Sequence, residues 1–151
     1  MKIKECCKII SQECIAKDIY SMWISTEAIA KEAKPGQFIS VYTKDAGKLL
    51  PRPISLCEID REKGALRIVY RIAGGGTREF SRLRSGDSID ILGPLGNGFP
   101  LEETKGKRVM LMGGGIGIPP MLETAKAIQG KADCLRLSGR AVSDRGAECS
   151  R

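Results

Sequence analysis

The segment ALRIVYRI, residues 65–72, alternates its side chains in the pattern of a β-strand. If this segment is extended, one of its faces is apolar and carries Leu66, Ile68, Tyr70 and Ile72. The other face carries Arg67, Val69 and Arg71. This alternation is typical of a strand that packs one face against a core and turns the other outward.

Similar short segments lie on both sides of this strand. SMWIS (residues 21–25), QFISVYT (37–43) and DSIDILGP (87–94) also combine β-branched and aromatic residues. Turn signals separate them, among them Pro35-Gly36 and Ser85-Gly86. Several strands at this spacing predict an antiparallel barrel or sandwich for the first hundred residues.

The segment LLPRPISLCEID, residues 49–60, places Arg52 between two prolines just before a strand. A residue that precedes a proline avoids the helical region, so Leu50 and Arg52 should be extended. Neither Pro51 nor Pro53 can donate to a sheet, so the segment should lie at a strand start or an open edge. Arg52 is therefore either the anchor of a ligand or, as is commoner for arginine, an ordinary surface residue.

The segment AGGGTREFSRL, residues 73–83, places three glycines before a short helical pattern with Phe80 and Leu83. We expect Thr77 to be the N-cap of that helix. Glycines let backbone N–H groups approach an anion at a helix N-terminus. The alternative is a plain flexible turn, since glycine is the common turn residue.

The chain changes character near residue 100. The apolar RVMLM (residues 108–112) leads into GGGIGIPP (113–120) and the helical pattern MLETAKAIQG (121–130). A strand, a glycine turn and a helix form the opening of a nucleotide-binding α/β unit. The match is imperfect, because Pro119 and Pro120 stand where helix-packing residues are expected.

Composition narrows the possible chemistry. The net charge is +7, which favours anionic partners. Aromatic residues make up 5% of the chain and there is no dense basic tract, which argues against a nucleic-acid module. The absence of histidine excludes imidazole bases and His-ligated zinc. The six cysteines lack C-x-x-C spacing, which gives little support to a metal site. Because the sequence shows no signal peptide or membrane span, we expect these cysteines to be reduced thiols in a cytoplasmic protein.

Four motifs carry a family resemblance when they are taken in order and spacing. They are RPISL (residues 52–56), VYRIAGGGT (69–77), GPLGNGF (93–99) and GGGIGIPPM (113–121). Over about residues 1–130 the chain resembles the FAD-binding electron-transfer subunits of dihydroorotate dehydrogenase B, in the ferredoxin–NADP⁺ reductase superfamily. The resemblance implies a mainly β fold: a Greek-key antiparallel barrel that binds FAD (residues 1–99), then an incomplete α/β nucleotide-binding domain (100–130).

The resemblance also implies roles for individual residues. Arg52 would contact the FAD pyrophosphate and Ser55 would lie near the reactive flavin N5, as the candidate catalytic group. The remaining FAD contacts would be Pro53, Ile54, Val69, Tyr70, Arg71, Gly76 and Thr77. The nicotinamide nucleotide would contact Gly113, Gly114, Gly115 and Gly117. Tyr70 shares a face with core residues, so we expect its backbone rather than its ring to make the contact.

The implied function is that of an oxidoreductase subunit in pyrimidine biosynthesis, a flavoprotein of electron transport. Electrons would pass from a dihydroorotate-oxidising catalytic subunit through an iron–sulfur cluster to FAD, and then as hydride to NAD⁺. The partner would be that catalytic subunit, in a cytoplasmic hetero-oligomer without nucleic acid or membrane. Two alternatives stay open: the flavin subunit of an NADH-dependent ferredoxin or hydrogenase complex, and a non-enzymatic nucleotide-binding module.

The C-terminal residues 131–151 depart from the family pattern. The family continues with further strands and a four-cysteine [2Fe–2S] site, whereas this chain ends at Arg151 in a segment rich in Arg, Ser and Gly. We interpret this tail as a truncated or frame-altered end. It predicts disorder, no second strand of the nucleotide domain and no cluster, with the helix after Pro120 docked only on strand 108–112 and apolar surface left open.

Overall fold

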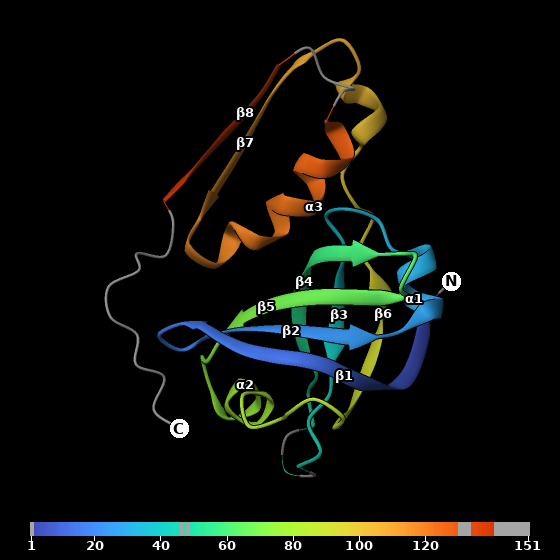
Figure 1. Cartoon of the computed structure of the whole chain (residues 1–151), viewed down its shortest axis with the longest axis vertical. Helices are drawn as coiled ribbons and strands as arrows, with labels where there is room; N and C mark the ends of the chain where they lie inside the picture. The colour runs from blue at the N-terminus through green and yellow to red at the C-terminus, as the bar shows by residue number, and fades with distance from the viewer. Residues whose placement is uncertain (1, 46, 48, 130–133, 141–151) are drawn as a thin grey trace.

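The protein forms a β-barrel with a smaller α/β unit at one end (Figure 1). The structure is a computed structural model and describes residues 2–45, 47, 49–129 and the backbone of 134–140. Barrel strands are β1 (Ile3–Ala16), β2 (Ile19–Ser25), β3 (Phe38–Val41), β4 (Arg52–Asp60), β5 (Ala65–Arg71) and β6 (Ser88–Leu95). Short helices α1 (Glu27–Glu32) and α2 (Gly75–Phe80) follow β2 and β5.

The six strands close into an antiparallel barrel in the order β1-β2-β5-β4-β3-β6. Strands β3, β4 and β5 are consecutive neighbours, and β6 then returns to lie between β3 and β1. A fourth strand that returns beside the first of three is the Greek-key arrangement. The predicted Greek-key barrel is therefore confirmed.

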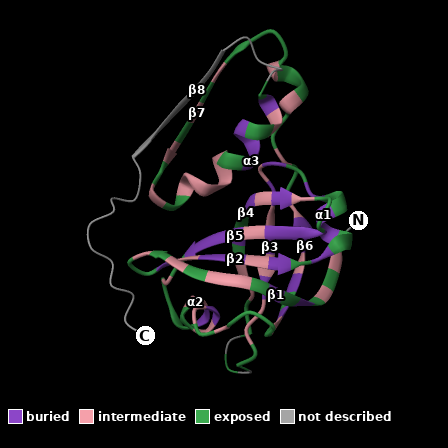
Figure 2. Ribbon diagram, in the orientation of Figure 1, coloured by how far each residue is buried: buried purple, intermediate pink, exposed green. Residues whose placement is uncertain are grey.

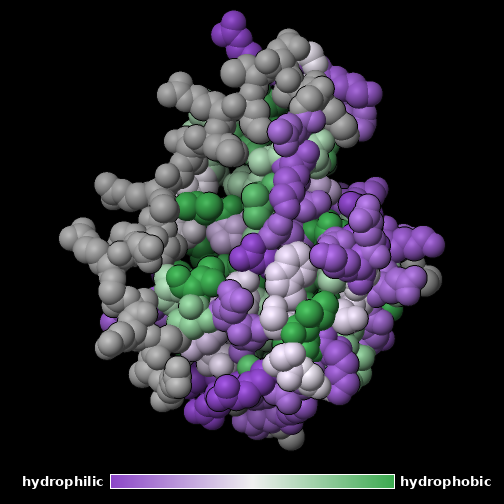
Figure 3. Space-filling model, viewed as in Figure 1, coloured by the Kyte–Doolittle hydropathy of each residue, from purple (hydrophilic) through white to green (hydrophobic). Residues whose placement is uncertain are grey.

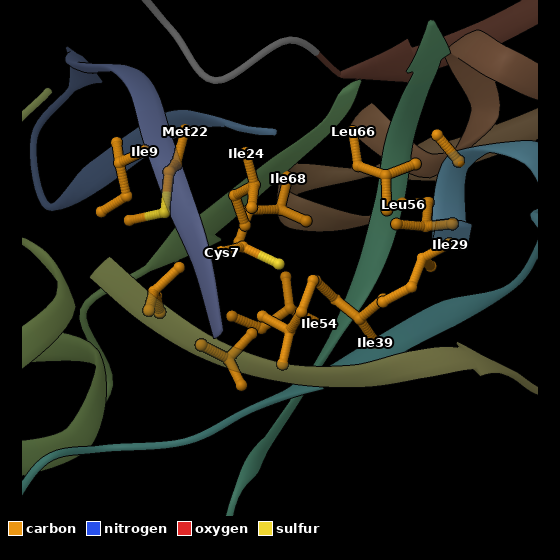
Figure 4. Close-up of a cluster of buried hydrophobic side chains, with 14 of the residues drawn as sticks. Cys7, Ile9, Met22, Ile24, Ile29, Ile39, Ile54, Leu56, Leu66 and Ile68 are labelled. Atoms are coloured by element: carbon orange, nitrogen blue, oxygen red, sulfur yellow. The ribbon is translucent and has the colours of Figure 1, made fainter. Parts of the chain in front are cut away.

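The barrel core is built from the inward faces that the sequence pattern predicts. Leu66 and Ile68 of β5 are fully buried, and they pack with isoleucines such as Ile24 and Ile39 from other strands (Figure 4). Figure 2 shows buried residues along the barrel strands and exposed ones at the turns. Because the inward side chains alternate with outward ones, each strand contributes one face to a shared core.

Helix α2 closes one end of the barrel, where the Phe80 ring is buried edge-on against the ring of Tyr70. The expectation that Thr77 is the N-cap is wrong, because the helix begins at Gly75 with Gly74 as its N-cap. Thr77 is the third helical residue, and its hydroxyl accepts hydrogen bonds from Ala73 N at 2.9 Å and Gly74 N at 3.2 Å. Glycine can adopt the helical backbone conformation, so the helix begins within the run of glycines.

The second unit contains η1 (Leu101–Thr104), β7 (Arg108–Gly114), η2 (Gly115–Gly117), α3 (Pro119–Ile128) and β8 (Cys134–Arg140). Strand β8 pairs in parallel with β7, from Arg108 opposite Cys134 to Gly114 opposite Arg140. The expectation that the tail lacks a second strand is therefore wrong for 134–140, because backbone hydrogen bonds form a ladder whatever the composition. The expected disorder at 131–133 and 141–151 lies outside the described residues.

Helix α3 packs against the barrel strand β4 as well as β7 (Figure 1). The buried Glu123 carboxylate accepts a hydrogen bond from Ile59 N at 3.1 Å. Glu58 bridges the two units, because it pairs with Lys126 on α3 and with Arg67 on β5. The expectation that this helix docks only on strand 108–112 is wrong, since polar groups of β4 offer it a second docking site.

The second unit does leave apolar side chains open, as the sequence predicts. Met110 and Met112 of β7 are 56% and 72% exposed, and Figure 3 shows apolar side chains gathered over α3 on this face. None of the helices that the structure describes has the length and apolar character needed to span a membrane.

Three described cysteines are free thiols: Cys6, Cys7 and Cys57. Cys14 is disulfide-bonded, so the expectation of six reduced cysteines is wrong at that residue. Sequence spacing does not show which sulfur atoms the fold brings within bonding distance.

Candidate functional site

A hollow of ≈ 560 Å³ opens in the barrel wall where strands β4 and β5 separate. The two strands pair from Leu56 opposite Ile68 to Asp60 opposite Ala65. Beyond those pairs, residues 52–55 pair with β3 and residues 69–71 pair with β2. Backbone groups on the two facing segments are thus left without a strand between them, and a ligand can use them.

Residues from four segments line this hollow. They are Arg52, Pro53, Ile54, Ser55, Val69, Tyr70, Arg71, Ala73, Gly74, Gly75, Thr77, Ile116 and Pro120. The predicted flavin contacts on β4 and β5 and the predicted loop residue Thr77 are all in this set. The structure therefore brings three separate sequence motifs to one place.

Arg52 stands at the start of β4, the strand start that its two prolines predict. One guanidinium N–H donates to the carbonyl oxygen of Leu50. The same guanidinium lies against Gly76, where a Cβ atom would come 2.5 Å from Nε. Gly76 does not line the hollow, but its missing side chain makes room for the arginine that does.

The glycine loop 73–77 lies next to Arg52 at the hollow, because the guanidinium packs against Gly76. Thr77 ties the loop together, because its hydroxyl accepts from two backbone N–H groups and donates to Gly74 O at 3.2 Å. A Cβ atom at Gly74 would have open space around it, so this side of the loop presents bare backbone. Bare backbone and a neighbouring guanidinium together suit a phosphate group.

Tyr70 borders the hollow although its side chain belongs to the core, being 3% exposed. Its hydroxyl donates to Gln12 Oε1 at 2.8 Å. Burial, with a smaller contribution from Tyr20, raises the pKa of the Tyr70 hydroxyl well above its ordinary value. The group therefore stays protonated, and the interpretation of the ring as a core residue is confirmed.

The glycine turn of the second unit meets the barrel at the same hollow. Ile116 and Pro120 line it, whereas Gly113, Gly114, Gly115 and Gly117 do not. A Cβ atom at Gly113 would come 2.9 Å from Gly117 O, so this glycine lets the turn fold back on the end of β7. A side chain at Gly114 or Gly117 would meet nothing within 4 Å.

Charge and reactivity show what the hollow can do. Arg52 and Arg71 line it, and none of the described lining residues is acidic, so an anion is favoured.

Burial raises the pKa of the Cys7 thiol to about 12 and that of Cys57 to about 11, so both stay protonated and unreactive. The described residues contain no cluster of side chains that could hold a metal ion. The site is equipped to bind and orient a reactive group rather than to supply one.

Sequence reasoning missed five of the lining residues: Ala73, Gly74, Gly75, Ile116 and Pro120. A signal was present for all five, because they belong to the glycine-rich segments 73–83 and 113–120. No local signal shows that both turns face one hollow, since Ile116 and Pro120 are distant in sequence from β4.

Comparison with protein families matches residues 6–99 to the oxidoreductase FAD-binding domain. Among curated proteins, the chain is 45% identical over 129 residues to the dihydroorotate dehydrogenase B (NAD(+)) electron transfer subunit of Streptococcus mutans, which covers 85% of this chain and 50% of that protein. It is 43% identical over 125 residues to the same subunit of Listeria monocytogenes, covering 82% of this chain and 49% of that one. The chain thus spans about half the length of these relatives.

Among solved structures, the chain is similar to an NADH-dependent reduced ferredoxin–NADP oxidoreductase that was described for flavin-based electron bifurcation. The TM-score is 0.78 at 33% sequence identity, over 88% of this chain and 46% of that one. The similarity includes the barrel and the start of the second unit, since it extends well beyond the residues matched by the family.

Proposed function

The chain belongs to the oxidoreductase FAD-binding domain family, and we propose that it binds FAD in the hollow between β4 and β5 and serves as a flavin-dependent electron-transfer subunit. The observation that supports this most strongly is the convergence of Arg52, the β5 segment 69–71 and loop 73–77 on one hollow of ≈ 560 Å³. Pockets of this size hold drug-sized ligands and cofactors.

The residues present fit the phosphate part of FAD. Arg52 is held by its two prolines and by Gly76, and it offers N–H groups in a planar fork that suits phosphate oxygens. Loop residues Gly76 and Thr77, next to this guanidinium, would bind the pyrophosphate together with it. Because Thr77 and Arg52 are already tied to backbone groups, little ordering cost remains when the phosphate binds.

The flavin ring would lie between the two separated strand segments. Pro53, Ile54 and Ser55 border one side, and Val69, the backbone of Tyr70 and Arg71 border the other. The Ser55 hydroxyl would be near the flavin N5, where it could donate or accept a hydrogen bond. The bound flavin supplies the hydride and single-electron chemistry, while these residues orient it and exclude water.

The turn at Gly113, Gly114, Gly115 and Gly117 would bind the nicotinamide nucleotide. Its support is geometric, because Ile116 of this turn lines the hollow proposed for the flavin. A nucleotide held at the turn would therefore lie next to the ring. We place the barrel domain at residues 1–99 and the start of the nucleotide domain at 100–130, on either side of the connection from β6 to η1.

The full activity would be that of the relatives: electrons exchanged between a dihydroorotate-oxidising catalytic subunit and NAD⁺. Support comes from two relatives above 40% identity that carry this name. A [2Fe–2S] cluster belongs to the family's electron path, and we assign no ligand for it among the described residues. The expected cytoplasmic location goes with this function.

A second function has an observation of its own. The solved NADH-dependent ferredoxin–NADP oxidoreductase has a TM-score of 0.78 with this chain. The chain would then be the flavin subunit of an NADH-dependent ferredoxin complex, with the same flavin site and a different electron partner. Curated relatives have higher identity, which favours the dihydroorotate dehydrogenase partner.

A visible spectrum and a cofactor extraction test the proposal. Purified protein, reconstituted with flavin, should show the absorption of oxidised flavin, and acid extraction should release FAD. NADH should bleach the colour if the nucleotide turn is functional. A protein that stays colourless after reconstitution would contradict the proposal. Copurification with either candidate catalytic subunit then separates the two functions.

A further inference from the structure

Gln12 of β1 links the barrel wall to the end of helix α2. Its side-chain Nε2 donates to Phe80 O at 3.0 Å and to Leu83 O at 2.7 Å. Its Oε1 accepts from the Tyr70 hydroxyl at 2.8 Å. Both N–H groups and the oxygen of the amide are therefore hydrogen-bonded. The three bonds connect residues that are 58, 68 and 71 positions apart in the chain.

The carbonyl groups of Phe80 and Leu83 set the orientation of this amide, because a carbonyl oxygen can only accept and the Gln12 amide must turn its N–H groups towards them. The amide oxygen then faces the hydroxyl of Tyr70, which donates to it. The ring of Tyr70 is stacked on Tyr20 with centroids 5.9 Å apart and meets Phe80 edge-on at 6.2 Å, so it has little freedom. Gln12 therefore ties the end of α2 to a fixed point of the barrel wall.

Helix α2 needs such a contact. It has six residues, from Gly75 to Phe80, and a helix of this length is not stable by itself in water. Its position depends on tertiary contacts, which include the buried Phe80 ring, the Gln12 bonds and a hydrogen bond from Lys44 N to Glu79 Oε1 at 2.6 Å. A shift of its C-terminal end would move its N-terminal residues, because the helix is a short rigid rod.

The N-terminal residues of α2 are those that face the hollow. Gly75 and Thr77 line it, and Gly76 lies against the Arg52 guanidinium. We propose that Gln12, anchored to the barrel wall by the Tyr70 hydroxyl, is a positioning residue that holds loop 73–77 in register with Arg52 for the FAD pyrophosphate. This inference rests on the proposed function and adds to it a residue with no contact to the hollow itself.

A role in positioning can be separated from a role in stability by comparing two flavins. Riboflavin has the flavin ring without a phosphate, whereas FAD has both. A displaced loop should weaken the binding of FAD and leave the binding of riboflavin unchanged. A general loss of stability would affect both flavins alike, because both would bind the same folded state.

The experiment titrates each flavin into the 151-residue apoprotein and its variants and follows fluorescence quenching. The variants are Gln12→Leu, which removes all three bonds at similar volume, and Gln12→Met, which removes them with an unbranched side chain of similar length. We expect FAD affinity to fall about tenfold in both, with riboflavin affinity within about twofold of the original. The control is Ile24→Val, a fully buried core residue of β2, which should leave the FAD-to-riboflavin ratio unchanged.

Each result decides the matter. A lowered ratio of FAD affinity to riboflavin affinity in Gln12→Leu and Gln12→Met supports the inference. An unchanged ratio in both would overturn it, whatever happens to thermal stability. If Gln12→Leu does not fold, as circular dichroism would show, Gln12→Met decides alone, because its unbranched side chain follows the path of the glutamine. If the unaltered protein binds neither flavin, the proposed function fails, and that failure is distinct from an unchanged ratio.

Discussion

The guanidinium group of Arg52 lies directly against the Cα atom of Gly76. A Cβ atom at position 76 would come 2.5 Å from Arg52 Nε and 2.8 Å from Cζ. Arg52 begins strand β4, and Gly76 lies in helix α2, which follows β5. Their contact therefore joins the two anion-binding features that the sequence shows separately. Several expected results depend on this contact.

Gly76→Ala should weaken FAD binding without unfolding the barrel. The helical backbone at 76 accepts alanine, so the conflict falls on the arginine, which is flexible and can move away from its place. We expect a loss of about tenfold in FAD affinity by equilibrium titration. The matched control is Gly114→Ala, where a Cβ atom has open space and φ is −130°. Equal FAD affinity in both variants would show that the contact has no role in binding.

Arg52→Ala should cost about 1.5–3 kcal/mol in FAD binding, the usual value of a charge-assisted hydrogen bond. Arg52→Lys should recover part of this, because an ammonium group keeps the charge but not the planar fork. Circular dichroism should show an intact barrel in both. FAD affinity unchanged in Arg52→Ala would make Arg52 an ordinary surface arginine, the alternative that its sequence context leaves open.

The cofactor should be FAD rather than FMN. Arg52 and loop 73–77 provide two adjacent anion-binding groups at the hollow, which suits a pyrophosphate better than a single phosphate. Chromatography of the extracted cofactor identifies it directly. Recovery of FMN from protein reconstituted with both flavins would contradict this expectation.

Gly113→Ala should disrupt the turn that begins the second unit. The new Cβ atom would come 2.9 Å from Gly117 O and 3.1 Å from Ile118 Cα, and neither backbone atom can move cheaply. Overpacking of this kind costs about 1–3 kcal/mol, which thermal unfolding would detect. Gly117→Ala, with open space at its Cβ, should unfold like the original protein. The reverse order of stability would show that this turn is not packed as described.

Glu58 should make stability depend on pH through its bridge between α3 and β5. Burial of its carboxyl acts to raise the pKa, but the bonds to Lys126 and Arg67 outweigh burial and lower it below the ordinary value of 4.5. A carboxyl whose pKa is lower in the folded state stabilises the fold above its unfolded pKa and loses that contribution as the pH falls through its folded pKa.

Glu58→Gln should therefore lower stability by about 1 kcal/mol at pH 7, and the difference should shrink as the pH falls below 4.5. Chemical denaturation at several pH values measures both quantities. Glu102→Gln serves as control, since Glu102 is 77% exposed and pairs with a Lys105 that is 68% exposed. A Glu58 effect that does not change with pH would exclude the ionic bridge as its cause.

The sequence by itself determined the features that depend on local geometry. The alternation of residues 65–72 predicted β5 and its buried face, because side chains of an extended chain point to opposite sides in turn. Pro51 and Pro53 predicted that Arg52 begins a strand, because they restrict the backbone and remove sheet donors. Pro119 and Pro120 fit the first positions of α3, where no N–H partner is needed.

The tertiary structure alone decided which of these features meet. The separation of β4 from β5 that forms the hollow follows from strand pairing, and pairing joins residues far apart in the chain. Ile116 reaches that hollow because α3 docks on β4 through Glu123, a contact between residues 64 positions apart. Gln12 carries no local signal of its task, since its partners Tyr70 and Phe80 come close only when the barrel closes. Local sterics act over a few residues, whereas hydrogen bonds and packing between distant segments exist only once the chain has folded.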